Sequence, residues 1–202
     1  MSKLICIDPG HGGYDPGVVA GARESDFNLV VALDLKAELE KDGCRVVMTR
    51  TSDTALGNNE KADLQQRCKI SDNSGADLFL SIHANAGGGN GAEAYCLSGG
   101  QGQIMAAELV ECLKPVMGYH GTPVKDGSGL YVVKHTAAPA VLLEVGFMDS
   151  SDFKLLAANF HRFGALLAPP LIKFLGGSVT PAVNDKEKGL TMIREGLRLL
   201  GG

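Results

Sequence analysis

Short apolar runs alternate with longer, partly apolar segments along the first 175 residues of the chain. The short runs predict buried strands at residues 3–7, 44–49, 77–83, 130–133 and 141–145, with a sheet edge at residues 92–97. The longer segments predict helices over residues 26–41, 59–73, 101–117 and 150–167. Pro169 and Pro170 are expected to end or kink the last helix, and residues 118–129 to form a loop.

This order of elements predicts an α/β fold with a single three-layer domain. Strands separated by helices of about 15 residues form a mostly parallel, twisted sheet with helices on both faces. In such sheets, ligands bind at the carboxyl ends of the strands. Polar residues that directly follow the strands are therefore the candidates for a functional site.

The composition changes at residues 176–181, Gly-Gly-Ser-Val-Thr-Pro, which is typical of a linker. We therefore expect a domain over residues 1–175, followed by a linker and a short amphipathic C-terminal helix over residues 176–202. Four apolar residues of this tail fall on one helical face: Leu190, Ile193, Leu197 and Leu200. That face either packs on the parent domain or associates with a second copy or a partner.

Charge and composition exclude several classes of protein. The 202 residues include 19 Lys and Arg against 23 Asp and Glu, a net charge of −4, whereas nucleic-acid-binding proteins usually carry a concentrated basic face. No apolar run reaches the length of a membrane helix, so no membrane insertion is expected.

The five cysteines form no CxxC pair and predict buried thiols in a reducing compartment. No signal peptide precedes the first strand, so we expect synthesis in the cytoplasm.

Four polar residues stand at or near the predicted strand ends. His11 follows the first strand among glycines, Glu24 precedes the first helix, and His83 closes the third strand. Each of these three also has a purely structural explanation, as a turn histidine, a helix N-terminal acid or a core histidine. Glu144 differs, because it lies inside an apolar strand and an ionised glutamate is rarely buried without a partner. It requires a metal, a positive charge or a raised pKa.

Taken together, these side chains suit a zinc hydrolase. Two imidazoles and one carboxylate make a three-ligand zinc set that leaves a fourth position for water. The second carboxylate would then act as the base for that water. The sequence has no HExxH pattern, so the ligands would converge from separate loops, and their spacing alone does not identify the site.

Four motifs occur in order between about residues 4 and 175. They are Ile-Asp-Pro-Gly-His-Gly-Gly-Tyr-Asp-Pro-Gly at 7–17, then Glu24, Ser-Ile-His-Ala-Asn at 81–85, and Pro-Ala-Val-Leu-Leu-Glu-Val-Gly-Phe at 139–147. This set resembles the zinc-dependent N-acetylmuramoyl-L-alanine amidases of the amidase-3 type. The resemblance implies one zinc ion held by His11, Glu24 and His83, with Glu144 as the catalytic residue.

The resemblance also implies a substrate. Peptidoglycan would be cleaved at the amide between the lactyl group of N-acetylmuramic acid and L-alanine of the stem peptide, which degrades the cell wall. Arg67 lies where the family often has an arginine, with a structural role expected. Together with the absent signal peptide, the resemblance implies a phage endolysin, or an autolysin released from within the cell, that reaches the wall through a holin or after lysis.

The chain departs from the family pattern at two places. Lys134 and His135 stand where an arginine is common, and residues 148–152 replace the usual Leu-Ser-Asn with what we expect to be only a helix cap.

A metallocarboxypeptidase-like peptidase and a non-catalytic cell-wall-binding protein are the alternative functions. A cysteine hydrolase is disfavoured because all five cysteines lie in predicted strands or helices. A phosphate-binding loop is disfavoured because residues 99–102 lack the Lys-Ser/Thr of a P-loop.

Overall fold

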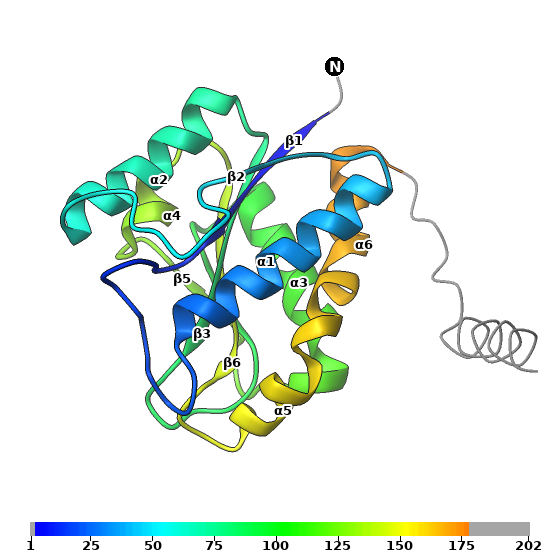
Figure 1. Cartoon of the computed structure of the whole chain (residues 1–202). Coiled ribbons are helices and arrows are strands. Elements are labelled where there is room, and N and C mark those ends of the chain that lie inside the picture. The colour runs from blue at the N-terminus through cyan, green and yellow to red at the C-terminus, as the bar shows by residue number, and fades with distance from the viewer. Residues whose placement is uncertain (1–2, 178–202) are drawn as a thin grey trace, which may run out of the picture.

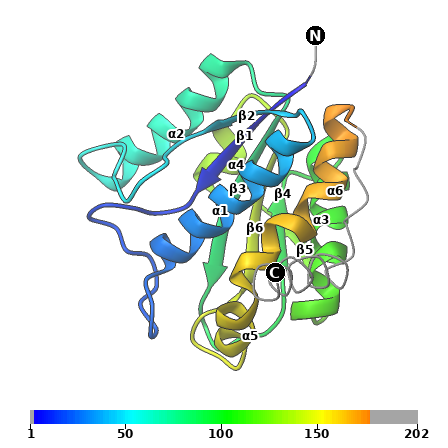
Figure 2. The same ribbon diagram turned by 45° about the vertical axis from the view of Figure 1, so that its right-hand side comes forward.

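The chain folds around one six-stranded sheet with helices on both sides (Figures 1 and 2). The computed structural model describes residues 3–177, so the expected amphipathic tail lies outside the described residues. The strands are β1 (Leu4–Pro9), β2 (Arg45–Met48), β3 (Leu78–Asn85), β4 (Glu93–Cys96), β5 (Val124–Asp126) and β6 (Ala140–Phe147). The helices are α1 (Glu24–Lys41), α2 (Glu60–Ser74), α3 (Gln101–Met117), α4 (Tyr131–His135), α5 (Asp152–Asn159), the 3₁₀ turn η1 (Phe160–Arg162) and α6 (Phe163–Leu175).

The sheet is mostly parallel, as the sequence predicts. Its order is β2-β1-β3-β6-β4-β5, and only β4 against β6 pairs antiparallel. The prediction that residues 92–97 form an edge is wrong, because β5 pairs outside β4. The prediction of a loop over residues 118–129 is wrong at β5, whose three residues, Val-Lys-Asp, are too few and too polar to give a strand pattern.

The two faces of the sheet are covered differently. Alternate residues of the strands, such as Ile5, Leu80 and Leu143, point to a large apolar core shared with α1, α3, α5 and α6. The other face carries a smaller cluster, including Phe79 and Leu142, under α2 and α4. Helices on both faces make three layers, which confirms the predicted fold class. Polar side chains of this second face, among them Asp8, Ser81 and His83, line a cavity bordered by residues of α2 and α4.

The prediction of a strand at residues 130–133 is wrong, because Leu130 is the N-cap of helix α4 and residues 131–133 are its first turn. Tyr-Val-Val favours a strand by propensity, but Val132 and Val133 are buried when a single helical turn lays them against the second face of the sheet. Burial of both valines on one side therefore overrides the local preference.

The last predicted helix is broken at a different place. It divides at η1, and α6 then continues through Pro169 and Pro170 to Leu175. Of the two expected effects of the prolines, an end or a kink, the end is therefore wrong. Leu167, Leu171 and Leu175 lie four residues apart and are buried in the large core. This continuous apolar stripe holds the helix together although each proline lacks a backbone N–H.

A buried ion cluster lies between α2 and the carboxyl end of β1. Arg67 Nη1 contacts Asp8 Oδ1 at 2.7 Å and Arg67 Nε contacts Asp63 Oδ1 at 2.6 Å, and Arg67 and Asp8 are only 3% and 1% exposed. Thr49 and Ser81 donate hydroxyl hydrogen bonds to the two oxygens of Asp8. Every oxygen of this buried carboxylate is therefore satisfied, and these contacts give Arg67 the structural role expected of it.

We expect Arg67→Met to lower the free energy of unfolding by about 3–5 kcal/mol, because it leaves the buried Asp8 carboxylate without its counter-charge. Lys36→Met is the control, since its pair with Glu40 is exposed on α1 and is worth about 0.5 kcal/mol or less. Urea unfolding of both variants measures the difference. Equal small losses would show that the cluster is not a stabilising centre.

The same cluster makes stability depend on pH. Burial alone would raise the pKa of Asp8, but the charge of Arg67 and the hydrogen bonds of Thr49 and Ser81 outweigh it and lower that pKa. The contribution is therefore complete above the ordinary aspartate pKa of about 3.9 and is lost as the pH falls further. We expect the stability gap between wild type and Arg67→Met to narrow below about pH 4, as measured by urea unfolding across that range.

Candidate functional site

The candidate residues meet at the carboxyl ends of the central strands, as the fold predicts. His11 follows β1, Glu24 is the first residue of α1, and His83 lies near the end of β3. Glu144 of β6 pairs directly with His83 in the sheet register, so both side chains point to the same face. Four positions far apart in the sequence therefore lie near the carboxyl ends of neighbouring inner strands.

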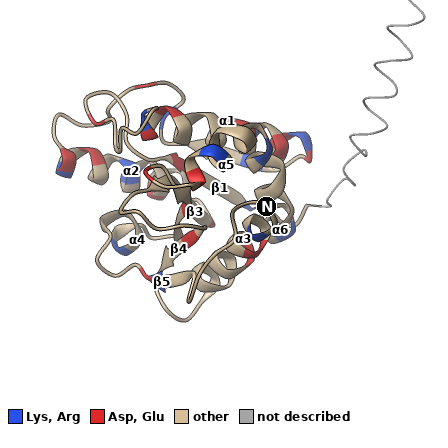
Figure 3. Cartoon of the chain, turned by 90° about the horizontal axis from the view of Figure 1, so that it is seen from below, with Lys and Arg blue, Asp and Glu red and all other residues tan. Residues whose placement is uncertain are grey.

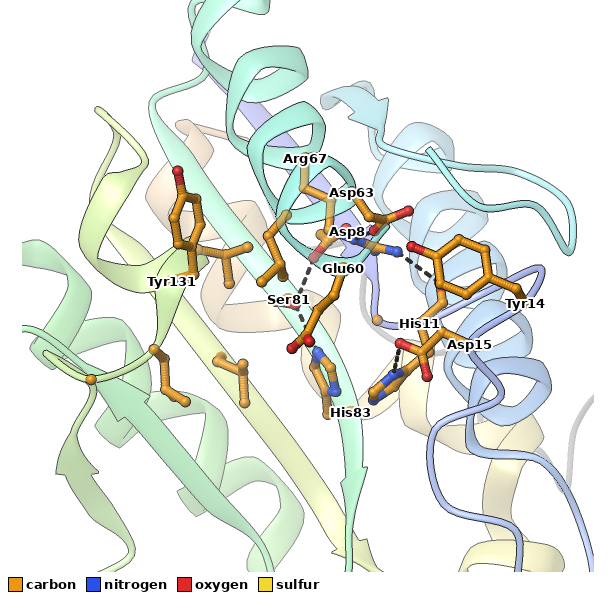
Figure 4. A pocket seen from close by; sticks show the side chains of 16 residues that line it. Asp8, His11, Tyr14, Asp15, Glu60, Asp63, Arg67, Ser81, His83 and Tyr131 are labelled. Atoms are coloured by element: carbon orange, nitrogen blue, oxygen red, sulfur yellow. Dashed lines mark hydrogen bonds and ion pairs between the residues drawn. The ribbon is translucent and has the colours of Figure 1, made fainter. Parts of the chain in front are cut away.

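His11, Glu24 and His83 form a possible metal site. One ligand atom from each residue lies within 4.8 Å of the others. Glu24 Oε1 is 3.0 Å from His83 Nδ1 and 3.2 Å from His11 Nε2. The two imidazole rings meet edge to face, with centroids 4.9 Å apart, and both border a cavity (Figure 4). A cation placed among these atoms would contact two nitrogens and a carboxylate.

The electrostatics of this cluster favour positive charge. Burial alone would lower the pKa of His11, but the Glu24 and Asp15 carboxylates outweigh it and raise the pKa to about 9. Burial would likewise raise the pKa of Glu24, yet hydrogen bonds from His11 and His83 bring it well below its usual range. The site therefore holds a carboxylate charged and attracts cations, whether protons or a metal ion.

Neighbouring groups orient each of these side chains. Asp15 Oδ2 is 2.7 Å from His11 Nδ1, which leaves Nε2 turned toward Glu24. The carboxylate of Glu24 accepts hydrogen bonds from Asn28 Nδ2 and from the backbone N–H groups of Ala84 and Val18. Such outer contacts are usual around metal ligands, where they fix ring and carboxylate orientation.

Sequence reasoning missed Asp15 and Asn28 as members of the site. Both carried a signal, because each lies four residues after a candidate, Asp15 after His11 and Asn28 after Glu24 on α1. Arg50 was missed as well. Its guanidinium donates to the carbonyls of Pro9 and Gly10 and so fixes the loop that carries His11.

Two glycines permit the close approach of the loop to the ligands. A Cβ on Gly10 would lie 2.2 Å from the His83 ring, and one on Gly17, whose φ is +62°, would lie 2.4 Å from Glu24 Oε2. His11 itself has a φ of 61°, in the left-handed region that few non-glycine residues adopt. The backbone around His11 is thus shaped for the position of its imidazole.

Glu144 stands beside the cluster without a counter-ion. Its Oε2 is buried and has no hydrogen-bond partner, and no Lys or Arg among residues 3–177 forms an ion pair with it. Burial is the main cause that raises the pKa of Glu144 to about 7. Lys134 is exposed on α4, and His135 stacks on Tyr131 with ring centroids 4.3 Å apart. Of the three explanations for a glutamate in this strand, a Lys or Arg partner is absent among residues 3–177, and a pKa near neutrality suits a group that gains and loses a proton.

A cavity of about 390 Å³ opens from the two histidines toward α2 and α4 (Figure 4). Its lining includes Tyr14, Glu60, Leu64 and Tyr131, and its floor includes Leu142 of β6. The cavity therefore offers apolar and aromatic surface next to the candidate metal site, which is the usual composition of a site for a small molecule or a polymer segment.

Known proteins with a similar sequence and fold are N-acetylmuramoyl-L-alanine amidases. The model of the N-acetylmuramoyl-L-alanine amidase family, of the amidase-3 type, matches residues 5–162. The germination-specific N-acetylmuramoyl-L-alanine amidase of Bacillus subtilis is 34% identical over 161 residues, covering 73% of this chain and 68% of that protein. The N-acetylmuramoyl-L-alanine amidase CwlM of Bacillus licheniformis is 39% identical over 154 residues, covering 73% of this chain but only 58% of that protein.

Solved structures show the same relationship. The catalytic domain of CwlV, an N-acetylmuramoyl-L-alanine amidase from Paenibacillus polymyxa var. colistinus, is 31% identical with a TM-score of 0.75, covering 87% of this chain and 99% of that one. The CwlD amidase of Clostridioides difficile, solved in complex with the GerS lipoprotein, is 30% identical with a TM-score of 0.78, covering 86% and 98%. Because the family model spans most of the chain and these relatives share its fold and sequence, the chain belongs to the N-acetylmuramoyl-L-alanine amidase family.

Proposed function

We propose that this chain hydrolyses the amide between the lactyl group of N-acetylmuramic acid and L-alanine of the peptidoglycan stem peptide, with one zinc ion as cofactor. The observation that carries the proposal is the convergence of His11, Glu24 and His83 beside the unpartnered carboxyl group of Glu144. Membership of the amidase family supplies the bond that is cut.

The donor set fits zinc better than the other common divalent ions. Two imidazoles and one carboxylate are a usual catalytic zinc set, whereas calcium and magnesium take oxygen ligands almost exclusively. The buried, partnerless Oε2 of Glu144 supports the same assignment, because a catalytic zinc site would need a proton acceptor near the water that the ion makes more acidic. A bound zinc ion polarises a carbonyl oxygen and makes a water molecule more acidic.

Glu144 moves the proton in this reaction. Its carboxylate accepts a proton from the water that attacks the scissile carbonyl, and it then donates that proton to the departing amine of alanine. The bond between the lactyl carbonyl carbon and the alanine nitrogen breaks, and the products are a lactyl carboxylic acid and a free peptide amine. A pKa near neutrality suits a group with both tasks.

Substrate recognition is expected to rely on local contacts. Figure 3 shows basic and acidic segments interspersed along the helices of the part of the chain that the structure describes, with no concentrated basic face in that view. Within residues 3–177, no helix combines the length and the apolar character that crossing a bilayer requires. The cavity beside the histidines, with Tyr14 and Tyr131 in its lining, offers the surface that a glycan or peptide segment would contact.

The products of peptidoglycan digestion test the proposed bond. We expect fragments that carry a free lactyl carboxylate on N-acetylmuramic acid, together with stem peptides that begin with a free L-alanine amine. Mass spectrometry of digested walls identifies both ends. Cleavage within the stem peptide would instead support the alternative of a carboxypeptidase-like enzyme, and intact walls would support a binding protein.

Metal content tests the ligand set. We expect one zinc per chain, loss of activity after chelation, and little loss of fold, since a domain of about 175 residues has a sufficient core without metal. His11→Ala and His83→Ala should each strongly reduce bound zinc, as measured by metal analysis beside a melting curve. Full zinc occupancy in both variants would contradict the assignment.

The two glutamates should respond differently to removal of their charge. Glu144→Gln is close to isosteric, so it should keep its zinc and its melting temperature while activity falls by about a hundredfold to ten-thousandfold. Glu24→Gln replaces an anionic ligand with a neutral amide and should weaken zinc binding itself. Excess zinc should therefore partly restore Glu24→Gln and leave Glu144→Gln inactive.

Zinc content, melting temperature and turnover of both variants decide the roles. Loss of zinc in Glu144→Gln would make Glu144 a ligand, and wild-type turnover would make it a structural residue. Each result would overturn its assignment as the proton carrier.

A further inference from the structure

The sheet face that carries His83 and Glu144 continues to β4 and β5. Glu93 of β4 pairs directly with Glu144 of β6. Two residues further along β4, Tyr95 pairs with Leu142 of β6 on one side and with Lys125 of β5 on the other. Directly paired residues share a face of the sheet. Glu93, Tyr95 and Lys125 therefore lie on the same face as the site, on the side of Glu144 away from His83.

These three residues form a polar cluster next to the site. Lys125 Nζ donates to Glu93 Oε1, and the other carboxylate oxygen accepts from Tyr95 at 3.0 Å and from the Asn85 amide at 3.2 Å. Lys125 Nζ also lies 5.7 Å from the centre of the Tyr95 ring. The ammonium is thus held in place by a carboxylate and an aromatic ring.

The ammonium of Lys125 has donors left for a ligand. Its side chain is 40% exposed, and Glu93 Oε1 and the Tyr95 hydroxyl together occupy at most two of the three N–H groups of the ammonium. By contrast, Arg50 and Arg67 are buried and their donors are bound by backbone carbonyls and carboxylates. Lys125 therefore offers an accessible positive charge beside a site whose other titratable side chains include the carboxyl groups of Glu24, Glu144 and Glu93.

The distance from the metal site suits the second residue of a stem peptide. His83 and Glu93 are two strand spacings apart, roughly 10 Å. Lys125 itself lies on β5, one strand further out, but its side chain reaches back so that Nζ contacts Glu93 Oε1. An extended dipeptide spans about 7 Å, and a charge-assisted hydrogen bond of about 3 Å to Nζ covers the remainder. In peptidoglycan, the residue after L-alanine is a glutamate linked through its side chain, so its α-carboxyl group is either free or amidated.

On the basis of the proposed function, we propose that Lys125 is a specificity-determining residue whose ammonium binds the free carboxylate of the stem-peptide residue that follows L-alanine. The peptide then runs from the metal site across Glu144 toward β5, and the glycan side occupies the cavity between α2 and α4. Glu93 and Tyr95 position the ammonium and leave at least one of its N–H groups free.

The test compares two muramoyl dipeptides that differ only in the second residue, with a free carboxylate in one and a carboxamide in the other. We expect wild type to prefer the carboxylate in kcat/KM, because a hydrogen bond to a charged group is worth about tenfold to a hundredfold. Lys125→Met should bring the ratio of the two kcat/KM values close to one, and Lys125→Arg should keep the preference. A ratio has the advantage that a general effect on Glu144 or on folding cancels.

Lys114→Met is the matched control, because Lys114 also contacts a glutamate and a tyrosine, Glu111 and Tyr119, but on α3 behind the opposite face of the sheet. It should leave the ratio at the wild-type value. An unchanged ratio in Lys125→Met, or a wild type without preference, would overturn the inference while the proposed function stands. Hydrolysis of neither substrate by wild type would overturn the proposed function and the inference with it.

Discussion

The structure depends on two buried arginines that bind the backbone directly after β1. Arg50, beyond the end of β2, donates to the carbonyls of Pro9 and Gly10, and Arg67 of α2 donates to those of Pro9 and His11. Both are long side chains that bring several donors into a place where backbone carbonyls would otherwise be unsatisfied. They hold the loop against the sheet, and Asp8 in turn balances the charge of Arg67.

This arrangement explains how a strained loop carries a functional side chain. His11 has left-handed backbone geometry and is preceded by a glycine that leaves no room for a Cβ. Such a conformation persists only where surrounding contacts determine it, and the arginines supply these contacts. Asp15 and Glu24 contact the imidazole itself, and charged groups on β1, on α2 and beyond β2 hold the backbone that carries it.

Sequence patterns predicted the strongly apolar elements and the residues at their ends. The strands β1, β2, β3 and β6 and the helices α1, α2 and α3 were evident because their apolar pattern is dictated by burial on one or both sides. Patterns failed at α4 and β5, where a few residues take their conformation from packing that local sequence does not encode. His11, Glu24, His83 and Glu144 were found through topology and motif resemblance. Their outer partners, such as Asn28, were not, because a hydrogen bond between side chains leaves no periodic trace.

The place of β6 in the sheet couples activity to the completion of folding. Among residues 3–177, β6 is the last strand along the chain, yet it lies between β3 and β4, which have no direct pairing without it. Its insertion joins the two parts of the sheet across a large sequence separation, a kind of step that is slow in folding. Glu144 arrives with this strand. A chain emerging from the ribosome, or one that has lost β6 by local unfolding, therefore lacks the carboxyl group to which we assign the proton transfer. On that assignment, a partly folded molecule is inactive toward the polymer that the folded form cleaves.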